Sequence, residues 1–149
     1  MVIAAGEPAP DFSLARAAGG EPFTRTDLLG RTTVLVFYPF AFSPVCTDQL
    51  SVYNEVLDEF EARGATLYGV SCDSTYSQSA FRDQLGIAIE QLSDFEPKGA
   101  ACRAFDVLHP DGFPQRALVI VGPDGVVKWS YQAPTPSELP GANLIFDAL

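Results

Sequence analysis

The chain has 149 residues, of which 47% are hydrophobic and 19% are charged. This length and composition are typical of one globular domain, so we expect residues 1–149 to form a single domain. Nine basic and nineteen acidic residues give a net charge of −10, which disfavours nucleic acids and anionic membranes as partners because both are polyanions. No apolar run approaches the roughly 20 residues that a membrane-spanning helix requires.

The N-terminal residues and the number of cysteines indicate in which cellular compartment the protein is expected. Residues 1–10 lack the basic flank and the apolar stretch of a secretory signal, so we expect a cytoplasmic protein. The three cysteines are an odd number at irregular positions, which fits a reducing compartment better than a disulfide framework. Metal binding is not predicted, because one histidine and three dispersed cysteines provide no close pair of ligands.

Strands and helices alternate along the first part of the chain. Residues 33–38 are a β-branched and aromatic run without polar alternation, which is typical of a strand covered on both faces. Residues 46–63 carry apolar side chains on one helical face, and Gly64 supplies a stop. A second apolar strand is predicted at 66–71, followed by a helix around 79–85.

The second part of the chain predicts short elements and a hairpin. We expect a short strand at 87–92, a short helix at 98–105, hairpin strands at 116–121 and 126–131 joined by the turn 123–125, and a last short helix at 142–149. Alternating strands and helices followed by a hairpin predict an α/β fold with a central mixed β-sheet flanked by helices. The thioredoxin-like fold has this order of elements.

The loop between the first predicted strand and helix carries the strongest chemical signal. It reads Pro-Phe-Ala-Phe-Ser-Pro-Val-Cys-Thr over residues 39–47. Ser43 suits the helix N-cap and Pro44 the first helical position, which places Cys46 in the first turn. Free N–H groups and the helix dipole favour negative charge there, so this thiol should ionise more readily than a free cysteine. The thiolate is the reactive form, which makes Cys46 a candidate nucleophile rather than a small buried hydrophobe.

Three other interpretations of this loop are weaker. Ser43 stands where a dithiol motif needs its first cysteine, which disfavours thioredoxin-type exchange. A Cys-His hydrolase needs a base near Cys46, and the only histidine, His109, lies in a turn sequence typical of a solvated loop. A non-enzymatic thioredoxin-fold module would bind a protein partner through its aromatic surface or act as a redox-sensitive chaperone.

We expect Phe40 and Phe42 mainly to pack in the core, with a share of their surface facing the substrate or a second subunit.

The chain resembles the peroxiredoxins over nearly its whole length. Pro39, Ser43 and Cys46 match the spacing of the peroxiredoxin signature Pro-x-x-x-Thr/Ser-x-x-Cys. Residues 9–14, Ala-Pro-Asp-Phe-Ser-Leu, are similar to the N-terminal strand motif of the family, and Arg116 stands at the position of its active-site arginine. The resemblance implies a thiol-dependent peroxidase that reduces hydrogen peroxide and organic hydroperoxides through a sulfenic acid.

The resemblance also implies the roles of the site residues. Cys46 attacks the peroxide, Ser43 hydrogen-bonds its oxygens, Arg116 holds the thiolate and polarises the O–O bond, and Pro39 shields the pocket. Such fixed donors lower the barrier, because negative charge builds on the departing oxygen. Without the thiol, Arg116 would be read as a strand-end arginine with its head in water. Position 49 holds glutamine where several relatives have glutamate, a departure that bears on hydrogen bonding beside the pocket.

The sulfenic acid must be reduced before a second turnover. Ser51 occupies the position where the bacterioferritin comigratory subfamily often places a resolving cysteine, and no cysteine follows Cys102. Cys72 and Cys102 therefore remain the candidates for a resolving residue, with simple packing favoured for Cys102.

The pattern most resembles the one-cysteine alkyl hydroperoxide reductase E group. That group implies reduction by an external thiol or redoxin, either mycothiol with mycoredoxin or thioredoxin, and the family implies a homodimer. The sequence holds no metal, haem, flavin or nicotinamide motif, so we expect the cysteine itself to be the redox centre and no cofactor to be required.

Overall fold

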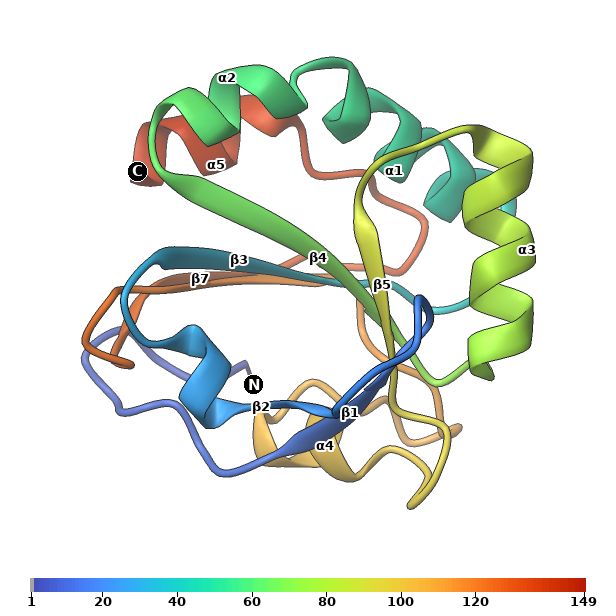
Figure 1. Ribbon diagram of the computed structural model, residues 1–149, viewed down its shortest axis with the longest axis horizontal. Coiled ribbons are helices and arrows are strands. Elements are labelled where there is room, and N and C mark those ends of the chain that lie inside the picture. The colour runs from blue at the N-terminus through green and yellow to red at the C-terminus, as the bar shows by residue number, and fades with distance from the viewer. Residues whose placement is uncertain (1) are drawn as a thin grey trace.

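A computed structural model describes residues 2–149, which form a seven-stranded sheet in the order β2-β1-β5-β4-β3-β6-β7 (Figure 1). The strands are β1 (Ser13–Arg16), β2 (Phe23–Thr24), β3 (Thr32–Phe37), β4 (Ala65–Ser71), β5 (Glu90–Ser93), β6 (Ala117–Val121) and β7 (Val127–Gln132). The helices are the 3-10 helix η1 (Arg25–Leu28) and the α-helices α1 (Pro44–Glu55), α2 (Leu57–Ala62), α3 (Thr75–Leu85), α4 (Ala100–Ala104) and α5 (Ala142–Ala148). The predicted α/β class with a mixed sheet is confirmed.

Strand direction in the centre of the sheet positions the candidate site. Strands β3, β4 and β5 are parallel, whereas β6 pairs antiparallel with β3 and β7 pairs antiparallel with β6. The carboxyl ends of the parallel strands therefore share one edge, and the antiparallel β6 begins at that same edge, where Ala117 pairs with Phe37. The loop that follows β3 consequently lies beside Arg116, the residue before β6.

Helices cover both faces of this sheet. In Figure 1, α1, α2 and α5 lie along one face with α3 at its side, and α4 lies on the opposite face near β1 and β2. Alternate residues of β3 divide between the two faces, because Val34 and Val36 belong to one hydrophobic cluster whereas Leu35 and Phe37 belong to the other. Burial on both faces explains why this strand shows no polar alternation.

The single helix predicted over residues 46–63 is wrong. It is divided into α1 and α2 at Val56, whose φ of −111° and ψ of 18° leave the helical region. The Val56 amide donates to Tyr53 O and Asn54 O, a tighter turn than the α-helical pattern. The apolar periodicity continues across this break, so the pattern alone did not reveal it.

Other boundaries differ because short caps and short strands carry little periodicity. Helix α3 begins at Thr75, earlier than predicted, because the Ser74 hydroxyl accepts a hydrogen bond of 3.2 Å from Ser77 N. Strand β5 and helix α4 are shorter than expected, and neither β2 nor η1 was predicted. A two-residue strand cannot display an alternating pattern.

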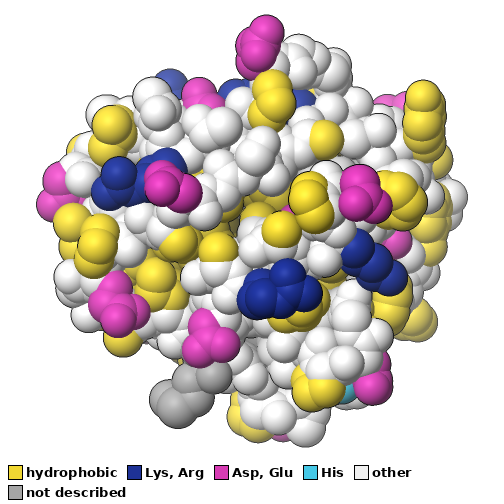
Figure 2. All heavy atoms as spheres, turned by 90° about the horizontal axis from the view of Figure 1, so that it is seen from below, with side chains coloured by type: hydrophobic (Ala, Val, Ile, Leu, Met, Phe, Trp, Pro, Cys, Tyr) yellow, Lys and Arg dark blue, Asp and Glu magenta, His cyan; other side chains and the backbone are white. Residues whose placement is uncertain are grey.

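Two general features concern helix composition and the charged side chains on one face. Within residues 2–149, no helix has the length and apolar composition needed to cross a membrane. Figure 2 shows a face on which Lys and Arg side chains are interspersed with Asp, Glu and apolar side chains, without one broad basic patch.

Candidate active site

The start of α1 places Cys46 against Arg116. Ser43 occupies the N-cap position with φ of −69° and ψ of 150°, and Pro44 is the first helical residue. Cys46 therefore lies in the first turn, as predicted. Its Sγ accepts a hydrogen bond of 3.1 Å from Nη2 of Arg116, which is 70 residues away in the chain.

The Arg116 guanidinium is buried and bonded in three directions. Only 2% of the residue is exposed. Nε donates to Pro136 O at 2.7 Å and Nη1 donates to Gln49 Oε1 at 2.5 Å, in addition to the bond to sulfur. These contacts exclude the interpretation of Arg116 as a strand-end arginine with its head in water.

The charge of Arg116 lacks a carboxylate partner in the described part of the chain. The ion pairs of residues 2–149 join other side chains, namely Arg16 with Asp27 and Glu90, and His109 with Asp111. A buried charge without a counter-charge is strongly unfavourable. Among the three acceptors that Arg116 bonds, the Cys46 sulfur belongs to a group that can carry a negative charge, whereas the Gln49 amide and the Pro136 carbonyl cannot.

Gln49 and Tyr53 extend the network along α1. Gln49 Nε2 donates to Tyr53 Oη at 3.2 Å, and Tyr53 Oη donates to Pro140 O at 2.6 Å. Burial raises the pKa of Tyr53 to about 12, so this hydroxyl remains a donor at physiological pH. The sequence alone does not assign Gln49 to the site, although its position one helical turn after Cys46 places it on the same helix face.

Ser43 occupies the expected position but makes a different bond. Its hydroxyl donates to Phe40 O at 3.0 Å, and its side chain does not cap α1. The first-turn N–H groups therefore remain without this cap, as the nucleophile hypothesis requires.

A few contacts hold the loop between β3 and α1. Ala41 N donates to Asp73 Oδ2 at 2.8 Å, a contact that connects this loop to the segment after β4. Phe42 has a φ of 71°, the left-handed region that favours glycine.

The expectation that Phe40 and Phe42 pack mainly in the core is wrong, because they are 50% and 46% exposed. The Phe40 ring contacts Phe113 and the Phe42 ring contacts Phe81, with centroid distances of 5.0 and 5.2 Å.

A pocket of about 260 Å³ opens beside the cysteine. Cys46 itself has no exposed surface. The loop between β3 and α1, the chain just before β6 and the chain between β7 and α5 form this pocket. The lining residues are Pro39, Phe40, Ser43, Pro44, Val45, Phe113, Arg116, Pro136 and Ser137. The structure thus brings Pro39, Ser43 and Arg116 to one cavity directly next to the sulfur.

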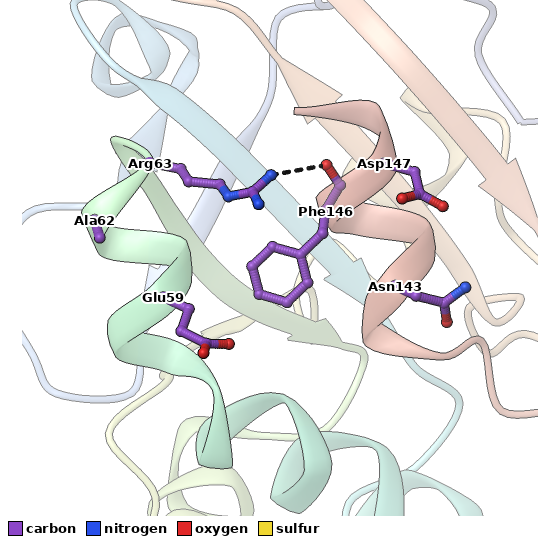
Figure 3. A pocket seen from close by; sticks show the side chains of 6 residues that line it. All are labelled: Glu59, Ala62, Arg63, Asn143, Phe146 and Asp147. Atoms are coloured by element: carbon purple, nitrogen blue, oxygen red, sulfur yellow. Dashed lines mark hydrogen bonds between the residues drawn. The ribbon is translucent and has the colours of Figure 1, made fainter.

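A larger hollow, of about 510 Å³, lies elsewhere between α2 and α5 (Figure 3). There the Arg63 guanidinium donates to Phe146 O at 3.2 Å and lies over the Phe146 ring. The residues around this hollow include no cysteine and no histidine. We therefore place the candidate site in the smaller pocket.

The other predicted site residues lie apart from Cys46. Cys72 and Cys102 belong to the hydrophobic cluster on the opposite face of the sheet from the cluster that contains Cys46. All three thiols are free. The expectation that the cysteines are dispersed is wrong for this pair, because the fold brings Cys72 and Cys102 together with Asp94.

His109 interacts with its own loop. Its ring stacks on Phe113 with a centroid distance of 4.3 Å, and Nδ1 accepts a hydrogen bond from Asp111 N. The hydrogen bond to Cys46 Sγ comes from Arg116 instead. This arrangement gives the hydrolase hypothesis no support.

Comparison with known proteins agrees with this geometry. The family model described as AhpC/TSA family matches residues 5–130. The chain is 30% identical to a putative peroxiredoxin in the rubredoxin operon of Clostridium pasteurianum, over 84% of this chain and 76% of the relative. It is also 30% identical to alkyl hydroperoxide reductase E of Mycobacterium tuberculosis, over 97% of this chain and 94% of the relative. The crystal structure of Enterococcus faecalis AhpC superposes with a TM-score of 0.86 and 27% identity, covering 99% of this chain and 90% of that one.

Proposed function

We propose that Cys46 is the thiol that attacks the peroxide, starting from the fact that this chain belongs to the AhpC/TSA family of peroxiredoxins and is a thiol-dependent peroxidase. Ser43, Arg116 and Pro39 are its proposed helpers. The whole chain is proposed to act as a single thioredoxin-like domain.

The observation that carries this proposal is the buried guanidinium beside the sulfur. Arg116 is 2% exposed, has no carboxylate partner among residues 2–149 and donates to Cys46 Sγ at 3.1 Å. A thiolate at that position neutralises the buried charge and is at the same time the nucleophilic form of cysteine.

The proposed reaction follows from these contacts. The Cys46 thiolate attacks one peroxide oxygen, the O–O bond breaks, and the other oxygen leaves as an alcohol or as water after it takes up a proton. The sulfur is oxidised by two electrons to a sulfenic acid, and the O–O bond is reduced by the same two electrons. The Arg116 guanidinium supplies a donor to the oxygen on which negative charge develops, and the Ser43 hydroxyl supplies another once it turns away from Phe40 O. Because Cys46 has no exposed surface, the pocket lining must separate slightly for peroxide to reach it.

The sulfenic acid is proposed to be reduced by an external thiol. One thiol condenses with it to form a mixed disulfide and water, and a second thiol then releases the Cys46 thiolate and a disulfide. The positions of Cys72 and Cys102 on the opposite face of the sheet support an external rather than an internal reductant. Mycothiol with mycoredoxin, or thioredoxin, are the proposed partners in a cytoplasmic setting.

We also propose a homodimer. Phe40 and Phe42, on the loop beside the pocket, leave about half of their surface exposed, and large aromatic side chains are enriched at protein interfaces.

The test is hydrogen peroxide consumption by the purified protein with dithiothreitol as reductant. We expect Cys46→Ser to abolish turnover, because Cys46 is the thiol that accepts a hydrogen bond from the buried Arg116 guanidinium. The matched control is the double variant Cys72→Ser/Cys102→Ser, which should keep turnover with this small reductant. Turnover that survives in Cys46→Ser would assign the nucleophile to another residue.

A further inference from the structure

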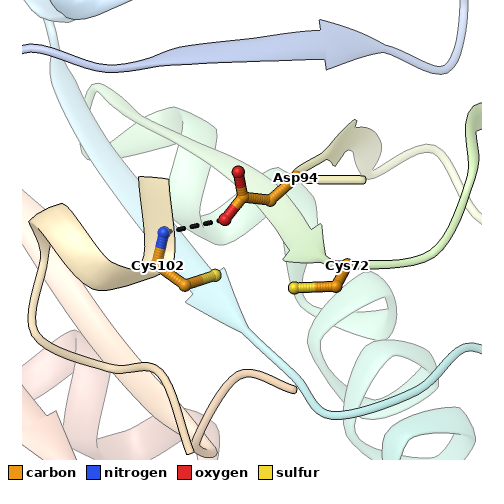
Figure 4. A group of neighbouring side chains, drawn as sticks. All are labelled: Cys72, Asp94 and Cys102. Carbon is orange, nitrogen blue, oxygen red and sulfur yellow. Dashed lines mark hydrogen bonds between the residues drawn. The ribbon is translucent and has the colours of Figure 1, made fainter. Parts of the chain in front are cut away.

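A second pair of thiols lies outside the site described above. Sγ of Cys72, Sγ of Cys102 and a carboxylate oxygen of Asp94 lie within 4.8 Å of one another (Figure 4). Figure 4 shows the two sulfur atoms pointing toward each other, one from the end of β4 and the other from α4. A disulfide bond is about 2 Å long, so rotation of the two side chains has to close a gap of a few ångströms at most.

The two thiols differ in accessibility and in ionisation. Cys72 keeps 9% of its surface exposed, whereas Cys102 is fully buried. The hydrogen bond from Cys102 lowers the pKa of Cys72. The same hydrogen bond, together with burial and the Asp94 carboxylate, raises the pKa of Cys102. The pair thus combines an accessible thiol that ionises readily with a buried thiol that stays protonated, and only the first can start an exchange reaction.

Cys72 is reached through a pocket of its own. That pocket has a volume of about 260 Å³ and also contains Lys98 and Phe95. The exposed Lys98 ammonium favours an anionic reagent at this opening. Pro39 and Phe40 of the loop before α1 line the same pocket. The opening that leads to Cys72 therefore lies next to the proposed peroxidase site, although the Cys72 and Cys46 sulfurs belong to separate hydrophobic clusters.

We propose that Cys72 and Cys102 form a second redox pair, which closes to a disulfide by exchange with a low-molecular-weight disulfide that enters beside Cys72. The inference does not depend on the proposed role of Cys46.

The exchange balances without any further reagent. The Cys72 thiolate attacks one sulfur of RSSR, forming a mixed disulfide and releasing RS⁻. Cys102 then attacks the Cys72 sulfur, and the second RS group leaves with the Cys102 proton as RSH. Two thiols are oxidised by two electrons, and RSSR is reduced to two thiols.

A metal site fits these residues less well. Both carboxylate oxygens of Asp94 are already bonded, Oδ1 by Ala101 N at 3.0 Å and Oδ2 by Cys102 N at 2.8 Å. Zinc in a structural site requires four ligands, and the group found in residues 2–149 has three members. The two thiols are therefore better explained as partners of each other.

The test uses the full chain with Cys46→Ser, which removes the peroxidase thiol, and oxidised glutathione as the probe. We expect the intact mass to fall by two hydrogens, and trypsin to release residues 64–82 joined to residues 99–103. With Cys102→Ser added, the protein should instead hold one glutathione on Cys72. With Cys72→Ser added, the protein should stay at its starting mass, because Cys102 has no exposed surface for glutathione to reach.

Two results would overturn the proposal. One is a Cys46→Ser protein that keeps its reduced mass, or that accumulates the glutathione adduct without closing, while circular dichroism shows a native fold. The other is one equivalent of zinc in the purified protein whose removal by a chelator is needed before either thiol reacts. Neither result bears on peroxide turnover by Cys46, which the dithiothreitol assay measures separately.

Discussion

At the scale of single residues, one buried cation organises the candidate site. Arg116 reaches Cys46, Gln49 and the Pro136 carbonyl from a single guanidinium. Arginine suits this position because its planar group stays protonated and presents several donors in fixed directions. Lysine would supply the charge, but its three donors share one nitrogen and cannot replace the three separate guanidinium nitrogens that bond these acceptors.

Replacing Arg116 with methionine tests the electrostatic role. We expect the pH profile for alkylation of Cys46 by iodoacetamide to move to higher pH, because the positive charge beside the sulfur is gone. Peroxide oxidation should slow by about 10²-fold or more, the usual cost of removing a fixed donor at developing negative charge. Arg116→Lys is the matched control and should retain part of the charge effect. An alkylation profile identical to that of the wild type would remove Arg116 from this role.

Gln49→Leu tests whether the amide serves Arg116. The substitution leaves a buried Nη1–H without an acceptor, which costs about 1–3 kcal/mol. We therefore expect a loss of that size in the free energy of unfolding, measured in urea. Gln84, an exposed residue of α3, supplies the control, since Gln84→Leu should change stability by less than about 0.5 kcal/mol. Equal stability of the two variants would contradict the assigned contact.

At the scale of elements, the N-cap serines of α1 and α3 differ in what their hydroxyl groups bond. Ser43 and Ser74 occupy equivalent N-cap positions, but only the Ser74 hydroxyl accepts a helix N–H. The Ser43 hydroxyl bonds to Phe40 O instead and lines the pocket. A cap bond contributes about 1 kcal/mol to a helix, so the two serines should respond differently to the same substitution.

The pair Ser43→Ala and Ser74→Ala measures this difference. Ser43→Ala should lower peroxide reduction by about 10²-fold through loss of a donor and change stability by less than about 0.5 kcal/mol. Ser74→Ala should lower the free energy of unfolding by about 1 kcal/mol and leave turnover unchanged. Thermal unfolding and steady-state peroxide consumption report both quantities. A purely structural Ser43 would show the reverse pattern.

At the scale of the whole molecule, the sheet separates two groups of thiols. Cys46, in the first turn of α1, belongs to the hydrophobic cluster on one face, whereas Cys72 and Cys102 belong to the cluster on the other face. The buried strands β3 and β4 stand between the two clusters, so no side-chain rotation alone joins Cys46 to the pair.

One equivalent of hydrogen peroxide should therefore act on Cys46 alone. We expect the intact mass to rise by one oxygen. When the sulfenic-acid trap dimedone is present, it condenses with loss of water, and the mass should rise by one dimedone less two hydrogens, with the label on Cys46. The Cys46→Ser variant is the control and should take up no label. A loss of two hydrogens, with Cys46 linked to another cysteine, would instead identify an internal resolving residue.

Local pattern predicted much of this protein. The buried strand β3, the loop of residues 39–47 and the start of α1 at Pro44 were predicted because capping and strand burial act over a few residues. The break at Val56 and the two-residue strand β2 were not, because neither changes the periodicity of side chains. The resemblance placed Arg116 in the site, although no local pattern around that residue indicates its partner.

The sequence by itself determined the α/β class, which depends on the order of strands and helices along the chain. It also determined the position of Cys46 in a first helical turn and the absence of a dithiol motif around it, which depend on neighbouring residues. Only the tertiary structure decided that Arg116 is buried against that sulfur, that Gln49 bonds the guanidinium, and that Cys72 meets Cys102. These contacts join residues distant in the chain, and they arise from strand order and direction. A linear pattern carries no record of that order.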